Sequence, residues 1–332
     1  MILNASQMLA FDDVWLQPQY SELESRATPD LSSQLSTNVI FSHPVIASNM
    51  ASVVGKHMAE TLDKSGSIAI LHRFMSRDEL VLIAKTSHMK QVAFSVGIKD
   101  EDYEIAQEMY DILGNRAIIL VDIAHAHTKK MGVMLSKIKK IGFSAVIAGN
   151  IATGDGYRFL YDHGADSVRV GIAGGKVCTT KNITGHHIPT LQSVIECNDV
   201  RQNSGIPMPS IIADGGISSS GDAAKALAAG ADFVCLGSVL AATSDSPSEI
   251  IFNSGETFKL HYGMSSKTAI DMFFKDKKTH VAPEGIKQLI PYTGETSDVL
   301  QEFLSGIKAS LTYTGAKNLN EFKKRAILRF KS

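Results

Sequence analysis

The chain has 332 residues, of which 44% are hydrophobic, so it can bury a large core in one α/β domain or in two smaller ones. A net charge of −1 with 20% charged residues argues against a nucleic-acid or anionic-membrane partner, and no apolar run approaches the roughly 20 residues of a membrane helix. Three cysteines in so long a chain, and an N-terminus unlike a signal peptide, predict a cytoplasmic protein without disulfides.

Short β-branched runs recur along the chain, and most are followed by a turn and a helical pattern. The predicted strands cover residues 44–49, 67–72, 91–97, 117–123, 144–149, 166–171, 209–214 and 232–237. Several are continuous apolar runs, which are typical of parallel strands covered on both faces. The predicted helices include 54–64, 76–86, 101–112, 128–140, 154–163 and 219–229.

This alternation predicts an α/β fold, a (β/α)8 TIM barrel that forms a single domain over residues 1–332. The segment HGADSVRVGI (163–172) resembles AGADFVCLGS (229–238), as expected of repeated βα units. An open doubly wound sheet would show the same alternation and stays an alternative. After residue 250 we expect a mobile active-site flap over about 265–285 and a helix near 298–309.

The loops after the seventh and eighth strands commonly bind phosphate in this fold. Here they read ADGG (213–216) and LGS (236–238), and their glycines let backbone N–H groups approach an anion. Ser238 can donate a further hydrogen bond. We therefore expect a phosphorylated ligand at these loops, with plain strand-end turns as the alternative.

The stretch GIAGGKVCTTK (171–181) contains glycines and a lysine, but it is not a P-loop. Gly171 lies one residue too close to Gly175 and Lys176 for the pattern GxxxxGK[ST], and Val177 replaces the required hydroxyl residue. The phosphate is therefore expected elsewhere, and this loop needs another role.

Cys178 is the candidate nucleophile of this loop. It follows the sixth predicted strand, and the nearby Lys176 and Lys181 would favour the thiolate that covalent attack requires. Cys235 lies within a predicted strand and Cys197 within a helical segment, so both are expected in the core. We assign no role to the pair His186-His187.

Six segments resemble, in family order, the IMP dehydrogenase and GMP reductase family. They are FDDVWLQPQYS (11–21), VCTTK (177–181), IIADGGI (211–217), HYGMSS (261–266), APEG (282–285) and LTYTGA (311–316). The resemblance covers nearly the whole chain. It implies a shared chemistry in which a cysteine thiolate adds to purine C2, and the covalent nucleotide adduct is linked to hydride transfer by a nicotinamide cofactor.

The resemblance also implies a role for particular residues. Catalysis would involve Cys178 as nucleophile, Thr180 and Glu284 as a proton relay, and Arg73 near C2. The nucleotide would contact Asp214, Gly215, Gly216, Gly237, Ser238, Gly263, Met264, Ser265 and Gly285. The cofactor would contact Ser25, Arg26, Asp122, Ile123, Ala124, Asn150, Ser310 and Tyr313. A potassium ion would bind the backbone carbonyls of Ala173, Gly175 and Cys178.

Two absences favour the reductase branch over the dehydrogenase. In the family, the dehydrogenases usually carry a regulatory domain inserted after the second strand, but here only about 20 residues separate the second and third strands. The dehydrogenase flap also carries an adjacent Arg-Tyr pair that activates water, whereas residues 265–284 contain neither arginine nor tyrosine. The segments at 72–74, 95–104 and 174–178 also resemble the bacterial reductases. The resemblance thus implies NADPH-dependent deamination of GMP to IMP and ammonia by a homotetramer.

Other functions stay open at this point. They are an IMP dehydrogenase that lacks its regulatory domain, a purine-nucleotide-binding barrel without turnover, and a reductase of dGMP or a modified guanylate. The sequence departs from the family pattern at Ala173, where the usual GIGPG reads GIAGG, at Arg73 in place of lysine, and at Val281. Alanine at 173 is compatible with the loop if its backbone avoids positive φ.

Overall fold

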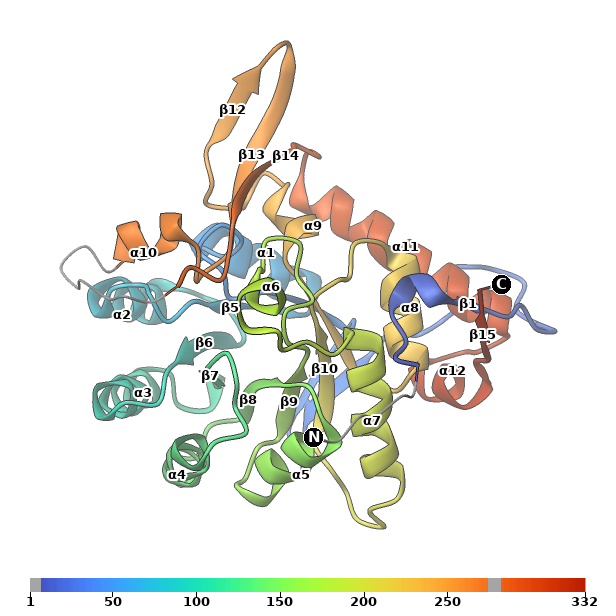
Figure 1. Ribbon diagram of the computed structural model, residues 1–332, viewed down its shortest axis with the longest axis horizontal. Coiled ribbons are helices and arrows are strands. Elements are labelled where there is room, and N and C mark those ends of the chain that lie inside the picture. Colours follow the sequence, from blue (N-terminus) through green and yellow to red (C-terminus); the bar gives the residue numbers. More distant parts are fainter. Residues whose placement is uncertain (1–6, 274–281, 332) are drawn as a thin grey trace.

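The computed structural model describes residues 7–273 and 282–331, and its centre is a closed barrel of eight parallel strands (Figure 1). The strands follow one another around the barrel in chain order, and the last pairs with the first to close it. They are β4 (Val45–Ala47), β5 (Ile68–Leu71), β6 (Val92–Val96), β7 (Ala117–Asp122), β8 (Ala145–Ile151), β9 (Ser167–Val170), β10 (Ser210–Asp214) and β11 (Phe233–Leu236). The predicted TIM barrel and all eight of its strands are confirmed.

Helices surround the barrel. They are α1 (Lys56–Ser65), α2 (Arg77–Thr86), α3 (Asp100–Leu113), α4 (Lys129–Ile138), α5 (Gly154–Asp162), α7 (Thr190–Gln202), α8 (Ser220–Ala228) and α11 (Thr296–Thr314). α11 packs against both α8 and α1, so it completes the ring. Four of these helices begin at a hydroxyl residue whose side chain accepts a backbone N–H three residues on, namely Ser76, Thr128, Thr153 and Ser219.

A hairpin closes the N-terminal end of the barrel. It consists of β2 (Ser33–Ser36) and β3 (Val39–Phe41), and its apolar side chains pack into the same cluster as the inward-facing residues of the barrel strands. Ser167 and Ser210, which begin β9 and β10, both donate to the Leu35 carbonyl, at 2.6 and 3.0 Å. The interior is therefore a packed core that is plugged from below.

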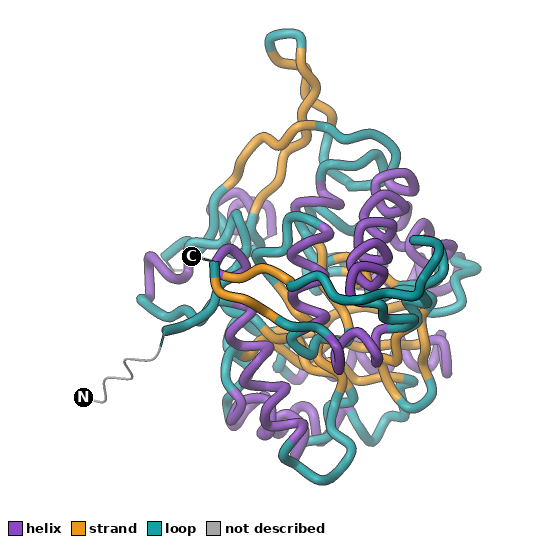
Figure 2. The backbone as a smooth tube through the Cα atoms, turned by 90° about the vertical axis from the view of Figure 1, so that its right-hand side faces the viewer, coloured by secondary structure: helices purple, strands orange, loops and turns teal. Residues whose placement is uncertain are grey.

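Three further strands, which the sequence did not predict, form a separate sheet outside the barrel. β12 (Ile250–Asn253), β13 (Glu256–Tyr262) and β14 (Lys287–Pro291) form an antiparallel sheet whose β12–β13 hairpin projects from the body (Figures 1 and 2). A short helix, α9 (Ser238–Ala241), follows β11 and packs against β13.

The remaining elements complete the chain. α10 (Lys267–Phe273) occupies the first part of the predicted flap, while residues 274–281, including Val281, lie outside the described residues. α12 (Leu319–Arg325) follows α11, and β15 (Leu328–Phe330) pairs with β1 (Val14–Leu16). None of the described helices combines the length and apolarity that crossing a membrane requires.

Candidate active site

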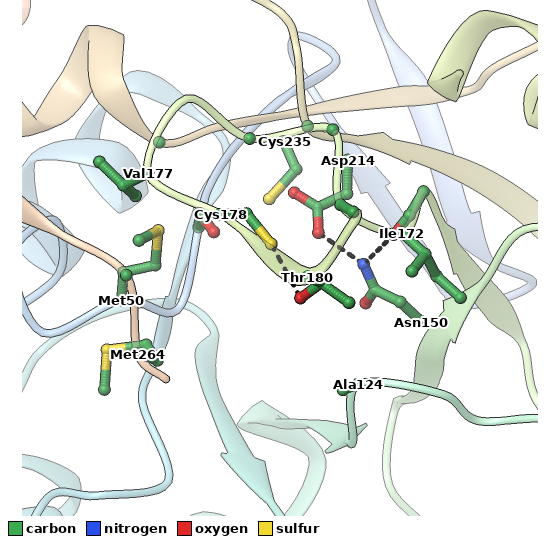
Figure 3. Close-up of a pocket in the computed structure, with 18 of the residues that line it drawn as sticks. Met50, Ala124, Asn150, Ile172, Val177, Cys178, Thr180, Asp214, Cys235 and Met264 are labelled. Atoms are coloured by element: carbon green, nitrogen blue, oxygen red, sulfur yellow. Dashed lines mark hydrogen bonds between the residues drawn. The ribbon is translucent and has the colours of Figure 1, made fainter. Parts of the chain in front are cut away.

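A pocket opens at the carboxyl ends of the barrel strands, where active sites of this fold lie (Figure 3). Strand-end loops and the segment after β13 line it. Seventeen of the predicted site residues are among its lining residues: Asp122, Ile123, Ala124, Asn150, Ala173, Gly175, Cys178, Thr180, Asp214, Gly215, Gly216, Gly237, Ser238, Gly263, Met264, Ser265 and Glu284. The structure therefore brings most of the predicted site together.

Cys178, Thr180 and Glu284 form a connected chain of side chains. Thr180, the first residue of the short helix α6 (Thr180–Thr184), donates from Oγ1 to the Glu284 carboxylate at 2.7 Å. Its Oγ1 also lies 3.2 Å from Cys178 Sγ. A hydroxyl has one hydrogen, so while Thr180 donates to Glu284 it can only accept from the thiol. The hydrogen-bond directions therefore allow a proton to pass from Cys178 through the Thr180 hydroxyl to Glu284.

Backbone contacts hold Glu284 in this place. The Thr179 N–H donates to the Glu284 carbonyl at 2.9 Å, and the Ile286 N–H donates to the Val177 carbonyl at 2.9 Å. Gly285 lies between them, where an added Cβ would be 3.1 Å from both the Val177 carbonyl oxygen and the Ser266 nitrogen. Gly285 thus acts through close backbone packing and does not line the pocket itself.

Arg169, which was not predicted as a site residue from the sequence, organises the floor of the pocket. Its guanidinium donates to Asp122 at 2.5 Å, lies 3.4 Å from the Asp214 carboxylate, and also bonds the side-chain oxygens of Asn49 and Asn150. Burial alone would lower the pKa of Arg169, but the two carboxylates raise it, so the side chain stays charged. The available signal was a charged residue within the apolar strand SVRV.

Asn150 and Asn49 each donate a hydrogen bond to one of the two carboxylates that face Arg169. Asn150 donates to Asp214 at 2.8 Å and to the Gly171 carbonyl at 2.6 Å, as Figure 3 shows. Asn49 donates to Asp122 at 3.1 Å. Asp122 therefore receives both a charged and a neutral donor, and Asp214 receives a neutral donor and faces the Arg169 charge, which sets the orientation of each carboxylate before any ligand arrives.

Arg73 lies beside this network, but it is not among the residues that line the pocket. Its Nε is 3.8 Å from the Asp122 carboxylate, and its guanidinium stacks over the Phe74 ring at 4.5 Å. Phe273 of α10 stacks on Phe74 in turn, with 5.5 Å between ring centroids. The start of the predicted flap thus packs on the loop that carries Arg73.

The glycines of the predicted phosphate loop adopt conformations that other residues avoid. Gly215 and Gly216 have φ values of 97° and 78°. A Cβ on Gly215 would lie 3.1 Å from the backbone of Gly174 and Gly175, so the loops after β9 and β10 are in direct backbone contact. Both loops line the same end of the pocket.

The loop before Cys178 is strained at Ala173. This residue is buried and has φ = 62°, a left-handed conformation that glycine adopts far more easily. The condition under which alanine would suit this loop, a backbone without positive φ, is therefore not met. His187 contacts the same loop, since its Nδ1 lies 2.8 Å from the Ile172 carbonyl.

Four predicted cofactor residues do not reach the pocket within one chain: Ser25, Arg26, Ser310 and Tyr313. Arg26 donates to the Tyr313 hydroxyl at 3.0 Å and lies over its ring at 5.4 Å. Arg26 instead lines a separate groove along α11.

The other two cysteines are buried, as predicted. Cys197 lies in α7 and Cys235 in β11, at the floor of the pocket. Burial raises the pKa of both thiols above the ordinary value, which keeps them protonated and unreactive. Cys178 is the half-exposed cysteine of the chain.

Comparison with known proteins agrees with this site. A family model described as "IMP dehydrogenase / GMP reductase domain" matches residues 8–332. The GMP reductases of Vibrio vulnificus and Vibrio cholerae serotype O1 are 35% and 36% identical over 337 residues, covering 98% of this chain and 95% of each relative. A solved GMP reductase from Trypanosoma brucei, in complex with guanosine 5′-monophosphate, superposes with a TM-score of 0.87 over 99% of this chain and 96% of that one, at 23% identity.

The fold and these matches define a TIM-barrel oxidoreductase. Within that class, the chain belongs to the IMP dehydrogenase/GMP reductase family, which confirms the resemblance drawn from the sequence.

Proposed function

We propose that the protein converts GMP to IMP and ammonia at the expense of NADPH, as part of purine interconversion. The observation that carries this proposal is the Cys178–Thr180–Glu284 chain beside a glycine-lined phosphate cradle. The named relatives, which are GMP reductases over nearly their full length, support it.

The proposed reaction has two parts, the loss of the 2-amino group and the transfer of a hydride to C2. The Cys178 thiolate adds to purine C2, and the C2–N bond to the 2-amino group then breaks. Thr180 and Glu284 supply the proton with which the amine departs as ammonia. NADPH supplies, when bound, the hydride that C2 accepts. The C2–S bond breaks as IMP forms, and Cys178 leaves as a thiolate ready for the next cycle.

The floor network positions the substrate and the cofactor relative to one another. Asp214 would bind the ribose of GMP, while Asp122 and Ala124 line the side of the pocket proposed for the nicotinamide. Because Arg169 bonds Asp122 and faces Asp214, one rigid side chain fixes the distance between the two sites. The inner part of the pocket thus offers polar groups suited to a nicotinamide. The four predicted cofactor residues outside the pocket, Ser25, Arg26, Ser310 and Tyr313, stay predictions.

A potassium ion and a homotetramer complete the proposal. The proposed ion ligands are the carbonyls of Ala173, Gly175 and Cys178, and oxygen donors suit such ions. The Gly175 carbonyl accepts the Cys178 N–H at 3.1 Å and keeps a second lone pair for a cation.

The structure also bears on the dehydrogenase alternative. Helix α2 fills the connection between β5 and β6, where the dehydrogenase carries its regulatory domain. The described part of the flap contains no arginine or tyrosine, in line with the sequence.

The test is to follow NADPH absorbance after adding GMP or dGMP over a range of potassium concentrations. We expect oxidation that depends on GMP, with IMP and ammonia formed in equal amounts. Absence of oxidation at every potassium concentration would contradict the proposal. NADH formation from IMP and NAD would instead identify a dehydrogenase.

A further inference from the structure

The charge balance of the pocket leaves the phosphate end short of cations. Three carboxylates line the pocket (Asp122, Asp214 and Glu284), against two cations (Arg169 and Lys176). Arg169 is already committed to two of the carboxylates. Lys176 forms no ion pair with any carboxylate in the described part of the chain. It is thus the positive charge that remains for a phosphate, which carries up to about two negative charges near neutral pH.

Lys176 lies beside the phosphate cradle. It follows Gly174 and Gly175, whose backbone is in contact with Gly215. On its other side, Gly263 approaches the chain so closely that an added Cβ would lie 2.9 Å from the Val177 carbonyl oxygen. The loop that carries Lys176 is therefore held between the glycine turn after β10 and the end of β13.

His261, near the end of β13, is a second polar group at this place. Only 2% of its surface is exposed, yet it lines the pocket. Its Nδ1 lies 2.9 Å from the Ser52 hydroxyl, while its Nε2 has no hydrogen-bond partner among the described residues. The Ser52 hydroxyl also lies 3.3 Å from the Tyr262 carbonyl, but its contact with Nδ1 is the shorter one. Donation from Ser52 to Nδ1 puts the ring hydrogen on Nε2, where it is available to a ligand.

The strand that carries His261 also packs against the helix that follows the Gly237 half of the cradle. Helix α9, which begins with Ser238 after Gly237, packs against β13. Burial, and then the positive charge of Lys176, lower the pKa of His261 to about 4, so the free ring is neutral. In β14 the neighbour across the ladder is Gln288, which adds no charge.

We propose that Lys176 and His261 form the charge-recognising part of a phosphate subsite, with the Lys176 ammonium pairing with a 5′-phosphate dianion and His261 Nε2–H donating to it. The glycine turns at 215–216 and 237 supply neutral backbone donors, and these two side chains supply the preference for a charged ligand. The inference rests on the proposed function only in taking a purine nucleoside 5′-monophosphate as the ligand.

Calorimetry with GMP, guanosine and inorganic phosphate tests this assignment. We expect Lys176→Met to weaken GMP binding about 10- to 100-fold, as for loss of a charged hydrogen bond, and to leave guanosine binding unchanged. The salt dependence of GMP binding should fall in the same variant. His261→Phe should weaken GMP binding, and His261→Gln, which keeps a donor, should restore part of it.

Lys287→Met provides a matched control, because Lys287 is exposed and starts β14 outside the pocket. It should bind GMP as the unaltered protein does. Equal weakening of GMP and guanosine by Lys176→Met would indicate a disturbed loop and would overturn the assignment, as would unchanged GMP binding. If the unaltered protein binds GMP in a Lys176-dependent way but oxidises no NADPH, this inference stands and the proposed function fails.

Discussion

Thr180 and Glu284 are 104 residues apart in the sequence, yet the Thr180 hydroxyl donates to the Glu284 carboxylate at 2.7 Å. The bond crosses from the loop after β9 to the segment that returns from α10. Cys178 lies at its other end, 3.2 Å from the same hydroxyl. The proposed nucleophile and the proposed final proton carrier are therefore joined by a single intermediate group.

This relay predicts that its members act in series. Thr180→Val and Glu284→Gln should each lower kcat about 100-fold, with little change in the KM for GMP, since each interrupts the same proton path. The double variant should be no slower than the slower single variant. Glu256→Gln, an exposed change in the projecting hairpin, is the control. A double variant with the product of both single losses would contradict action in series.

Cys178→Ala should abolish both turnover and the covalent adduct while leaving GMP affinity within a few-fold. The adduct requires the sulfur, whereas the phosphate and ribose contacts come from other strands. Intact-protein mass spectrometry after mixing with GMP measures the adduct. Cys235→Ala should retain it, because the Cys235 thiol is buried and protonated. An adduct that persists in Cys178→Ala would refute the nucleophile assignment.

Arg169→Met should lower the free energy of unfolding by about 3 kcal/mol, because it removes the buried cation that two partly buried carboxylates face and leaves only the more distant Arg73 beside Asp122. Activity should fall further than in Arg169→Lys, which keeps the charge but loses the planar fork. Arg158→Met removes a half-exposed ion pair with Asp162 and should cost less than about 1 kcal/mol. Urea unfolding distinguishes them, and equal costs for the two methionine variants would argue against the network.

Ala173→Gly should stabilise the protein by about 0.5–1 kcal/mol. Glycine relieves the left-handed strain at φ = 62°, and part of that gain is lost to the greater freedom of the unfolded chain. Ala173→Val should destabilise by about 1–3 kcal/mol, because a β-branched residue rarely adopts this conformation. Thermal unfolding of the pair checks the sign, and a stabilising valine would exclude left-handed backbone here.

Stability should fall as the pH drops from 6.5 toward 4. Burial lowers the pKa of His43 to about 4, so below its ordinary value of 6.5 the unfolded chain binds the proton more readily than the folded chain does. This histidine alone should cost about 2 kcal/mol between pH 7 and pH 5. His43→Gln should lose less over that interval than the unaltered protein, whereas exposed His88→Gln should follow it. Parallel losses in all three proteins would contradict the assignment.

The barrel could be predicted from the sequence because strands covered on both faces are short apolar runs, and eight of them stand out. The grouping of Cys178, Thr180 and Glu284 in one pocket could be predicted because their motifs recur in family order. Arg169 could not, since its partners come from the ends of four other strands and no local pattern shows that they meet. A charge inside an apolar strand was the one signal.

The elements outside the barrel were missed for a different reason. β12 and β13 carry half-exposed, mixed residues, and β14 pairs with β13 from across the flap, so no run of the sequence has the burial pattern of a strand. The plug hairpin is likewise short, at four and three residues. Its role depends on serine hydroxyls that bond it to the starts of barrel strands, a purely tertiary arrangement.

The plug at the foot of the barrel has a consequence for the traffic of small molecules. Because apolar side chains of β2 and β3 fill the N-terminal end, the pocket exchanges its contents through the mouth alone. Under the proposed reaction, the nucleotide, the hydride donor and the liberated ammonia all enter or leave through the same opening of the pocket. Ammonia, the smallest of them, either diffuses out past the bound nucleotide and hydride donor or stays until they have left. The order of product release therefore becomes part of the catalytic cycle.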